Sequence, residues 1–416
     1  MHKFTTILFY VLGFISMYVQ IFFLITFFEK RKTIQYRKEK IKLERYPSVT
    51  VAVPCWNEQN TVAKTLNSLL ELDYPKDKIT IIAVDDGSTD NTWEELKKFE
   101  KYPNIKILKK ENGGKHTAVN YAIKNSDSEF ISCLDADSFV EPETLKRMMT
   151  YFLKDENTMA VAPSILIHNP KTMTQTLQQV EYNWAVFMKK VLGILGGIYV
   201  TPGPFSIFRR KVFTDLGLFR KAHNTEDMEI AFRMQKNHYK IDQCNDAYVY
   251  TTGPKSIIAL YKQRLRWIYG FTMNTFDYRK ILFKKEYGFF SLVSVPAGFV
   301  SMVAVPYILG LLMFQIVKGV WNLVEKYQTV GFDFSWSFSW PSFDTFFLNT
   351  NAYVFTGIIL YILVMMTIII GKRMITGKYR FDFRIIYFML VFSFIAPFWV
   401  VKAMYNAVFA KKTAWR

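Results

Sequence analysis

Long apolar stretches at both ends of this 416-residue chain limit its fold more than any other feature. Residues 4–28 contain no charged side chain, and about 20 such residues suffice to cross the hydrocarbon core of a bilayer. No cleavage site of small residues is evident, so we interpret this stretch as a retained anchor, not as a removed signal peptide. Residues 289–317, 352–371 and 385–410 are again apolar. We therefore expect one N-terminal span and about three C-terminal spans around a more polar middle.

Basic residues beside the first span predict its orientation. Residues 30–45 hold eight Lys or Arg against two Glu, and such clusters tend to stay on the cytoplasmic side, where they also attract anionic lipid head groups. We expect a multi-pass protein of the cell membrane with its polar domain in the cytoplasm. Counting 385–410 as a full span would place Lys411 and Lys412 outside, against this tendency. A broken helix that returns to the inner face would remove the conflict, and the sequence leaves both alternatives open.

Cysteine number and charge exclude several classes of protein. Cys55, Cys133 and Cys244 are odd in number, far apart and without paired spacing, which argues against a disulfide framework or a zinc site and agrees with a reducing cytoplasm. The net charge of +18 could suit a protein that binds nucleic acid. No basic helix interleaved with aromatic residues lies outside the membrane flanks, so we expect no nucleic-acid partner.

Strand-like and helix-like patterns alternate through the polar middle. Apolar runs predict strands at 48–53, 79–84, 105–108 and 130–134, and the helix-like segments between them are 60–72, a helix from about 91, and 115–124. This alternation predicts an α/β domain with a mostly parallel sheet and helices on both faces. Neither a G-x-G-x-x-G turn nor a G-x-x-x-x-G-K-[ST] loop is present, so a dehydrogenase or an ATPase is not supported.

Two carboxylates one residue apart, Asp135 and Asp137, lie where the strand at 130–134 ends. Ligands of open parallel sheets bind outside the carboxyl ends of the strands, and adjacent carboxylates repel each other unless a cation or a donor neutralises them. Oxygen ligands suit Mg²⁺ or Mn²⁺. A solvated strand end is the plain alternative, but acidic residues at two further strand ends favour a metal site that holds a diphosphate.

Those two strands end in Pro54-Cys55-Trp56-Asn57-Glu58 and in residues 85–90. A carboxylate such as Asp86 can accept a hydrogen bond from a ring N–H of a base, and Trp56 offers a flat apolar surface. A turn followed by a helix N-cap explains part of residues 85–90. It does not explain acidic residues at three strand ends together.

Residues 112–115, Asn-Gly-Gly-Lys, precede a predicted helix. Glycines allow close backbone approach, the helix N-terminus favours anions, and Lys115 adds a point charge for a phosphate. A plain loop is the alternative.

Two further groups are candidates for the chemistry. Glu226 and Asp227 open a helical segment, where the helix dipole stabilises acidic residues. A carboxylate across the site from a metal could also act as a general base. Gln263, Arg266 and Trp267 share one helical face in a basic, aromatic stretch that a helix on the membrane surface would also explain.

Together these residues resemble the membrane-embedded, processive family 2 glycosyltransferases, which include poly-N-acetylglucosamine, hyaluronan and cellulose synthases. The resemblance covers residues 46–270 and the flanking membrane pattern. It rests on the motifs P-x-[YW]-N-E, D-x-D, [TE]-E/D and Q-x-x-R-W in their order and spacing. It implies a GT-A type nucleotide-sugar-binding domain in the middle of the chain. The expected parts are a membrane helix at 1–29, a basic linker at 30–46, the GT-A domain at 47–256, interfacial helices at 257–287, and a membrane domain at 288–416.

The resemblance also implies roles for individual residues. Asp227, paired with Glu226, is the expected catalytic base, and Asp135 and Asp137 are expected to hold Mg²⁺ or Mn²⁺. The residues expected to bind the nucleotide sugar are Cys55, Trp56, Glu58, Asp86, Lys115 and Asp135, and those expected at the acceptor and diphosphate are Gln263, Arg266 and Trp267. The implied donor is a UDP-sugar, with UDP-N-acetylglucosamine as first candidate. The acceptor would be a carbohydrate or a lipid-linked sugar, and an accessory membrane subunit could take part.

One segment departs from the family pattern. Residues 199–205, with Pro202 and Pro204, replace a small-residue stretch that lines the acceptor site in relatives, and prolines stiffen the backbone. The acceptor and the processivity therefore stay open. A one-step transferase that loads a lipid with sugar is one alternative, which the Q-x-x-R-W motif argues against. A non-catalytic membrane scaffold or secretion component is the other.

Overall fold

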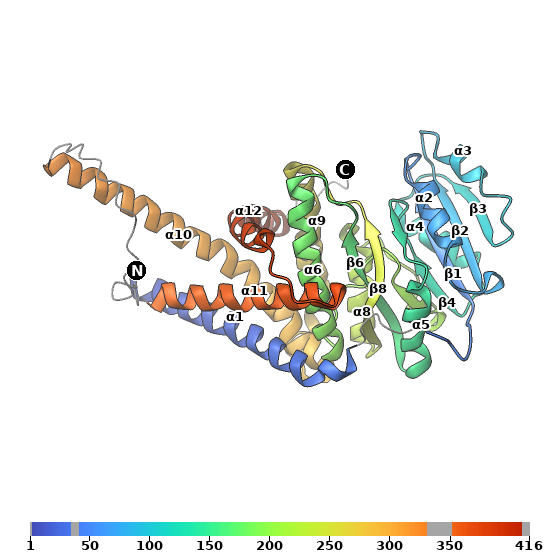
Figure 1. Cartoon of the computed structure of the whole chain (residues 1–416), viewed down its shortest axis with the longest axis horizontal. Coiled ribbons are helices and arrows are strands. Elements are labelled where there is room, and N and C mark those ends of the chain that lie inside the picture. The colour runs from blue at the N-terminus through green and yellow to red at the C-terminus, as the bar shows by residue number, and fades with distance from the viewer. Residues whose placement is uncertain (1, 35–40, 331–351, 410–416) are drawn as a thin grey trace.

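The structure, a computed structural model, describes residues 2–34, 41–330 and 352–409. Figure 1 shows an α/β domain at one end of the molecule and long apolar helices that extend from it toward the other end. This arrangement agrees with a GT-A-like domain inserted between helices that could span a membrane.

One mixed sheet of eight strands forms the centre of the α/β domain, in the order β3-β2-β1-β4-β7-β6-β8-β5. The strands are β1 (Val49–Cys55), β2 (Ile79–Asp86), β3 (Ile105–Lys110), β4 (Phe130–Cys133), β5 (Ser138–Val140), β6 (Thr158–Ile167), β7 (Ile207–Arg209) and β8 (Lys240–Thr251). The first four strands pair in parallel, as the sequence predicts. The second half mixes directions, because β7 runs antiparallel to β4 and β6 and β5 runs antiparallel to β8.

Helices cover both faces of the sheet, which explains the nearly continuous apolar strands. In β1, Val49, Val51 and Val53 pack into one core cluster and Ala52 packs into the other. The first cluster includes residues of α2 (Val62–Leu70), α3 (Thr92–Lys97) and α5 (Thr144–Lys154). The second includes residues of α4 (Lys115–Lys124), α6 (Met173–Ile194), α7 (Arg210–Leu216) and α8 (Glu226–Lys236). The prediction of an α/β domain with two covered faces is confirmed.

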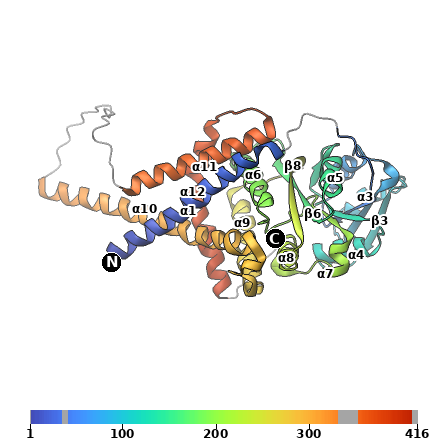
Figure 2. The ribbon, with the colours of Figure 1, turned by 90° about the horizontal axis from the view of Figure 1, so that it is seen from below.

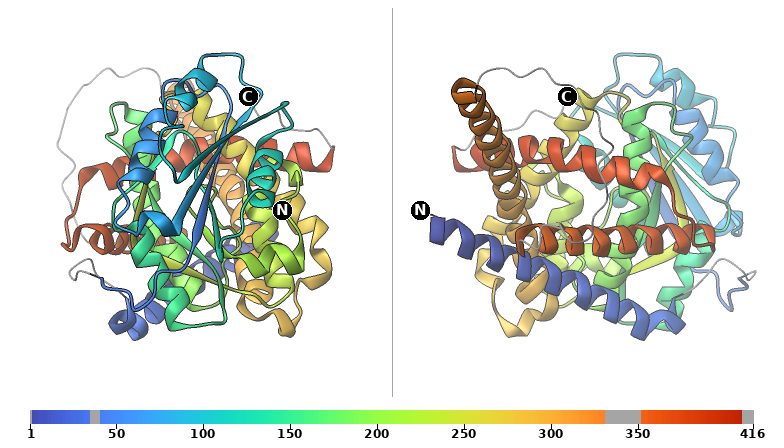
Figure 3. Two further views of the ribbon diagram at one scale, coloured as in Figure 1. Left: turned by 90° about the vertical axis from the view of Figure 1, so that its right-hand side faces the viewer. Right: turned by 60° about the vertical axis from the view of Figure 1, so that its left-hand side comes forward.

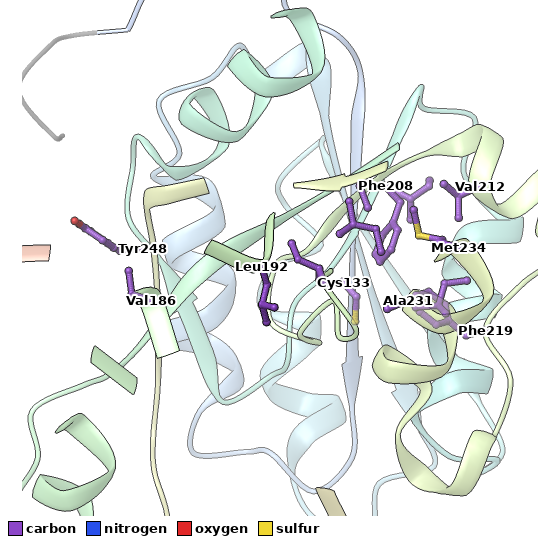
Figure 4. Packing of buried hydrophobic residues seen from close by; sticks show 14 of the residues in the cluster. Cys133, Val186, Leu192, Phe208, Val212, Phe219, Ala231, Met234 and Tyr248 are labelled. Carbon is purple, nitrogen blue, oxygen red and sulfur yellow. The ribbon is translucent and has the colours of Figure 1, made fainter. Parts of the chain in front are cut away.

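The second cluster lies directly beneath the candidate site. Figure 4 shows Cys133, at the end of β4, between Leu192 of α6 and Ala231 of α8. α6 begins with a capping box in which Thr172 and Gln175 satisfy each other's backbone amides. Further along the same helix, the ring of Phe187 packs 5.3 Å from the ring of Phe27. α6 thus joins the sheet to the first apolar helix.

Four helices among the described residues are long and apolar enough to cross a membrane. The apolar spans lie in or overlap the helices α1 (His2–Lys30), α10 (Val295–Val330), α11 (Ala352–Thr376) and α12 (Phe383–Val408). α1 lies alongside α11 (Figure 3, right). α10 contains Pro306 but is a single helix. It continues beyond the predicted span 289–317 into the stretch 321–351. That stretch is aromatic and poor in Lys and Arg, which predicts a loop on the outer face, and its residues 331–351 lie outside the described part of the chain.

The last apolar stretch forms one helix that continues through Pro397. Figures 1 and 2 show α12 running across α11 rather than beside it, and it packs against α9 (Ile257–Asp277), α10 and α6. The broken helix, one of the two alternatives that the sequence leaves open, is therefore absent from residues 383–408. Lys411 and Lys412 lie outside the described residues, so the side on which they lie stays a prediction.

Candidate functional site

The loops that follow β1 and β2 are joined by hydrogen bonds. The backbone N–H of Asn57, a residue with φ of +56°, donates to Ser88 Oγ at 3.0 Å, and the N–H of Glu58 donates to Thr92 Oγ1 at 2.8 Å. Asp90 accepts from the N–H of Thr92 at 3.0 Å, so the expected turn is present, while Asn91, the N-cap residue of α3, makes no side-chain cap hydrogen bond. These contacts fix the edge of the sheet on which the acidic residues lie.

Asp86 is almost fully buried and makes three contacts. Its carboxylate pairs with Lys110 Nζ at 2.6 Å and accepts from the N–H groups of Gly113 at 3.1 Å and Gly114 at 2.9 Å. Gly114 has a φ of +90°, which favours glycine. The two glycine amides, expected to face a phosphate, therefore bind Asp86 and connect this residue to the start of α4.

Lys115, the first residue of α4, lies between two carboxylates. Its amine forms an ion pair with Asp135 and lies 3.7 Å from Glu226 Oε1. The nearby negative charges raise the pKa of Lys115 well above its ordinary value, against the opposing effect of burial. A Cβ on Gly203 would lie 2.6 Å from Lys115 Nζ and 3.4 Å from Asp135 Oδ2. Glycine at position 203 thus leaves room for this lysine and carboxylate.

Asp227 is held by the segment that departs from the family pattern. Its backbone carbonyl accepts from the N–H of Thr201 at 3.2 Å and from Thr201 Oγ1 at 2.9 Å. Its carboxylate accepts from the N–H of Met228 at 2.9 Å. Burial, assisted by repulsion from Glu226, raises the pKa of Asp227 to about 6 although Lys115 and Arg266 oppose the shift. A carboxylate with such a pKa is ionised at neutral pH and can still accept a proton.

Asp137 accepts from Ser138 Oγ at 3.0 Å. Burial, with repulsion from Asp135 and Glu58, raises the pKa of Asp137 to about 6. The described residues contain no cluster of three or more metal-ligating side chains. Mg²⁺ is commonly held by one or two carboxylates together with substrate phosphates. The oxygen donors of Asp135 and Asp137, where negative charge is concentrated, therefore fit a divalent cation that shares its ligands with a diphosphate.

A pocket brings several of these groups together. Lys115, Glu226 and Asp227 line it with Cys133 and the segment 201–203. The structure thus places residues of four separate chain segments at one opening, although more than 100 positions separate Lys115 from Asp227.

The helix α9 carries the remaining predicted residues. Gln263 Oε1 accepts from Arg264 Nη1 at 2.8 Å, and the Arg264 guanidinium lies 4.1 Å from the ring centroid of Trp267. Arg264 is buried and pairs with Glu181 of α6. Arg266 Nη1 donates to the carbonyl of Asn224 at 3.0 Å, just before the acidic pair. Gln263 and Trp267 are therefore oriented by Arg264, and Arg266 contacts the loop that precedes Asp227.

Sequence patterns missed some of these residues. The Cys55 thiol is fully buried and donates to the carbonyl of Val53 at 3.4 Å, so its side chain has no surface for a nucleotide, while Trp56 and Glu58 are half-buried. Arg264 and Glu181 were not expected, because 83 positions separate them. Thr201 and Gly203 lie in the segment that the sequence marks as unusual, which was the available signal.

Comparison with known proteins adds sequence and fold relationships. Residues 50–217 match the family model described as Glycosyl transferase family 2. A poly-beta-1,6-N-acetyl-D-glucosamine synthase from Staphylococcus epidermidis is 32% identical over 274 residues, which are 65% of this chain and 66% of that protein. A synthase of the same name from Staphylococcus aureus is 30% identical over 236 residues, 56% of this chain and 57% of the relative. The matched segments thus cover less than two thirds of the length of each relative.

The fold has a counterpart among solved structures. A mannosyltransferase from Pyrobaculum calidifontis, in complex with GDP-Man and Mn2+, superposes with a TM-score of 0.60 over 96% of this chain and 99% of that chain, at 16% identity. At that identity the likeness concerns the fold alone. It covers the apolar helices as well as the α/β domain.

Proposed function

Because this chain belongs to glycosyltransferase family 2, we propose that it transfers a sugar from a nucleotide donor to a growing polysaccharide at the cytoplasmic face of a membrane. The observation that carries the proposal is the pocket in which Asp227, Lys115 and Glu226 meet. The similarity to poly-N-acetylglucosamine synthases supports UDP-N-acetylglucosamine as the first candidate donor. The four apolar helices support a membrane location.

The proposed reaction inverts the anomeric carbon. Asp227 accepts the proton of an acceptor hydroxyl while that oxygen attacks the anomeric carbon from the face opposite the leaving group. The bond from that carbon to the phosphate oxygen breaks, and its electron pair leaves with the nucleoside diphosphate. The Lys115 amine lies between Asp135 and Glu226, where it can neutralise charge that develops on the diphosphate.

Asp135 and Asp137 would hold Mg²⁺ or Mn²⁺, which would supply further positive charge for the leaving diphosphate. On the acceptor side, Trp267 offers an aromatic ring and Gln263 an amide, both oriented by Arg264. The segment 201–203 contacts Asp227 and lines the same pocket. These residues would hold the acceptor sugar in line with the donor.

The base assignment is tested by Asp227→Asn, which keeps the shape of the side chain and removes its basicity. We expect turnover to fall by about 10²–10⁴-fold, the usual contribution of general base catalysis, with unchanged affinity for UDP in calorimetry. Product release is measured on membranes supplied with a panel of nucleotide sugars. Turnover close to that of the wild type would show that Asp227 is not the base.

The metal assignment is tested by Asp137→Ala in donor-binding titrations with Mn²⁺ and with EDTA. We expect the wild type to bind UDP at least about tenfold more tightly with Mn²⁺, since the cation would bridge carboxylate and diphosphate, and the variant to lose this difference. Asp127→Ala, an exposed change near the opposite end of the same strand, serves as control. A metal effect that survives Asp137→Ala would refute the site.

The size of the product distinguishes a polymerising enzyme from a one-step transferase. A ladder of oligomers indicates polymerisation, and a single lipid-linked sugar indicates one-step transfer.

A further inference from the structure

One face of α9 contacts the loop that precedes the acidic pair. The residues of this face are Arg266, Gly270, Asn274 and Asp277, at the spacing that aligns side chains along a helix. Arg266 contacts Asn224, Gly270 and Asn274 contact Thr225, and Asp277 contacts His223. We call these four residues the α9 stripe. The helix with the Q-x-x-R-W motif thus also supports the backbone that leads into Asp227.

The loop against this stripe has an unusual backbone. Ala222, His223 and Asn224 have φ values of +35°, +57° and +61°, in a region that residues other than glycine rarely adopt. Such conformations are strained and persist only where the surroundings enforce them. The loop therefore depends on external contacts to keep the acidic pair in place.

Asn274 supplies one of these contacts while one of its own polar atoms stays buried without a hydrogen bond to any described residue. Its Nδ2 donates to Thr225 Oγ1 at 2.9 Å and to the carbonyl of Gly270 at 2.8 Å. The residue is fully buried, and its Oδ1 has no hydrogen-bond partner among the residues that the structure describes. A buried polar atom without a partner destabilises a fold, so stability alone does not account for an asparagine here.

Gly270 supplies the closest approach. A Cβ at this position would lie 2.9 Å from the Cβ of Thr225 and nearer still to its other two side-chain atoms. Glycine therefore sets how near α9 comes to Thr225, two residues before Asp227. At the outer end of the stripe, Asp277 Oδ2 lies 2.9 Å from His223 Nε2.

We propose that Gly270 and Asn274 are positioning residues, which fix the loop 222–225 and so place Asp227 against the acceptor hydroxyl. The inference rests on the proposed function of Asp227 as the base. It extends the role of α9 from the acceptor to the geometry of the base. A displacement of about 1 Å can cost 10²-fold in rate, and this is the scale of shift that a methyl group at position 270 would impose.

The experiment compares Gly270→Ala and Asn274→Ala with Thr275→Val in the full-length protein. Thr275 is equally buried on the same helix, and its hydroxyl donates only within the helix, to the carbonyl of Phe271 at 2.8 Å. For each variant the melting temperature, the Kd for UDP with Mn²⁺ and the kcat for sugar transfer are measured. We expect kcat to fall about 10- to 100-fold for both stripe variants, with the Kd for UDP within twofold of the wild type. Thr275→Val should retain kcat.

A double-mutant cycle distinguishes a steric effect from misfolding. Thr225→Ala shortens the side chain that the new methyl group at position 270 would strike. The double variant Thr225→Ala/Gly270→Ala should therefore recover part of the kcat that Gly270→Ala loses, so that the two effects are not additive. The inference is overturned if folded stripe variants keep the kcat of Thr275→Val, or if kcat and UDP affinity fall together. If Asp227→Asn itself retains turnover, the proposed function fails, independently of the stripe.

Discussion

At the scale of single residues, burial and the charges of Glu226, Lys115 and Arg266 determine the proton affinity of Asp227. Burial and the Glu226 carboxylate raise the pKa of Asp227 to about 6, and the two cations oppose this. A base must be deprotonated to act, so activity should fall as pH drops through about 6 and level off above it.

Glu226→Gln tests this balance. Removing the neighbouring negative charge lowers the pKa of Asp227, so the acid limb of the pH–kcat profile should move to lower pH. The measurement is kcat from pH 4.5 to 8, with Glu100→Gln, an exposed change in the same domain, as control. A limb that stays in place or moves to higher pH would contradict the assigned coupling.

Residue patterns predicted part of the site, for a definite physical reason. Parallel strands end on one edge of the sheet, so acidic motifs after strands 1, 2 and 4 could be placed together from sequence. Which partner each side chain selects could not be predicted. Asp86 binds the amides of Gly113 and Gly114, and Arg264 pairs with Glu181, through packing that no local spacing encodes.

At the scale of elements, the contact between α6 and α11 joins the α/β domain to the apolar helices. A Cβ at Gly371 of α11 would collide with the backbone carbonyl oxygen of Asn183 in α6 and lie 3.0 Å from its carbon. Backbone atoms cannot move aside as a flexible side chain can. Glycine at position 371 therefore sets the spacing between the two helices.

Gly371→Ala should destabilise the protein by about 1–3 kcal/mol, the usual cost of overpacking. Gly357 lies on the same helix, and no described residue comes within 4 Å of its added Cβ. Gly357→Ala should therefore be neutral or slightly stabilising, because alanine favours helices. Thermal unfolding in detergent measures both. Equal melting temperatures for the two variants would show that this helix contact is not tight.

Element boundaries followed the sequence closely where periodicity was strong. The helix 115–124 has its predicted limits, and the first four strands lie within two residues of theirs. The antiparallel pairing of β5 and β7 was not foreseen, since these strands are three residues each and carry too short a pattern to reveal direction. The path of α12 across α11 was also beyond prediction, because a uniformly apolar helix has no side that marks its neighbours.

At the scale of the whole molecule, charge asymmetry predicts which parts face the cytoplasm. The native cysteines are all buried, so an added surface cysteine reports its own side. Lys98→Cys in the α/β domain should react with a membrane-impermeant thiol reagent only after lysis, and Ser337→Cys in the predicted outer loop should react on intact cells. The unmodified chain, which should stay unlabelled, is the control. The opposite labelling pattern would invert the topology.

The apolar cluster around Phe271 spans both halves of the protein. It contains Met228 and Phe232 of α8, Met302 of α10, and Trp399 and Val400 of α12. The helix that begins with the acidic pair and the helix that supports it therefore share their packing with helices that are apolar enough to cross a membrane. We therefore expect turnover to depend on lipid composition, because a bilayer whose thickness does not match α10 and α12 would strain them and, through this shared packing, the helix that carries the proposed base.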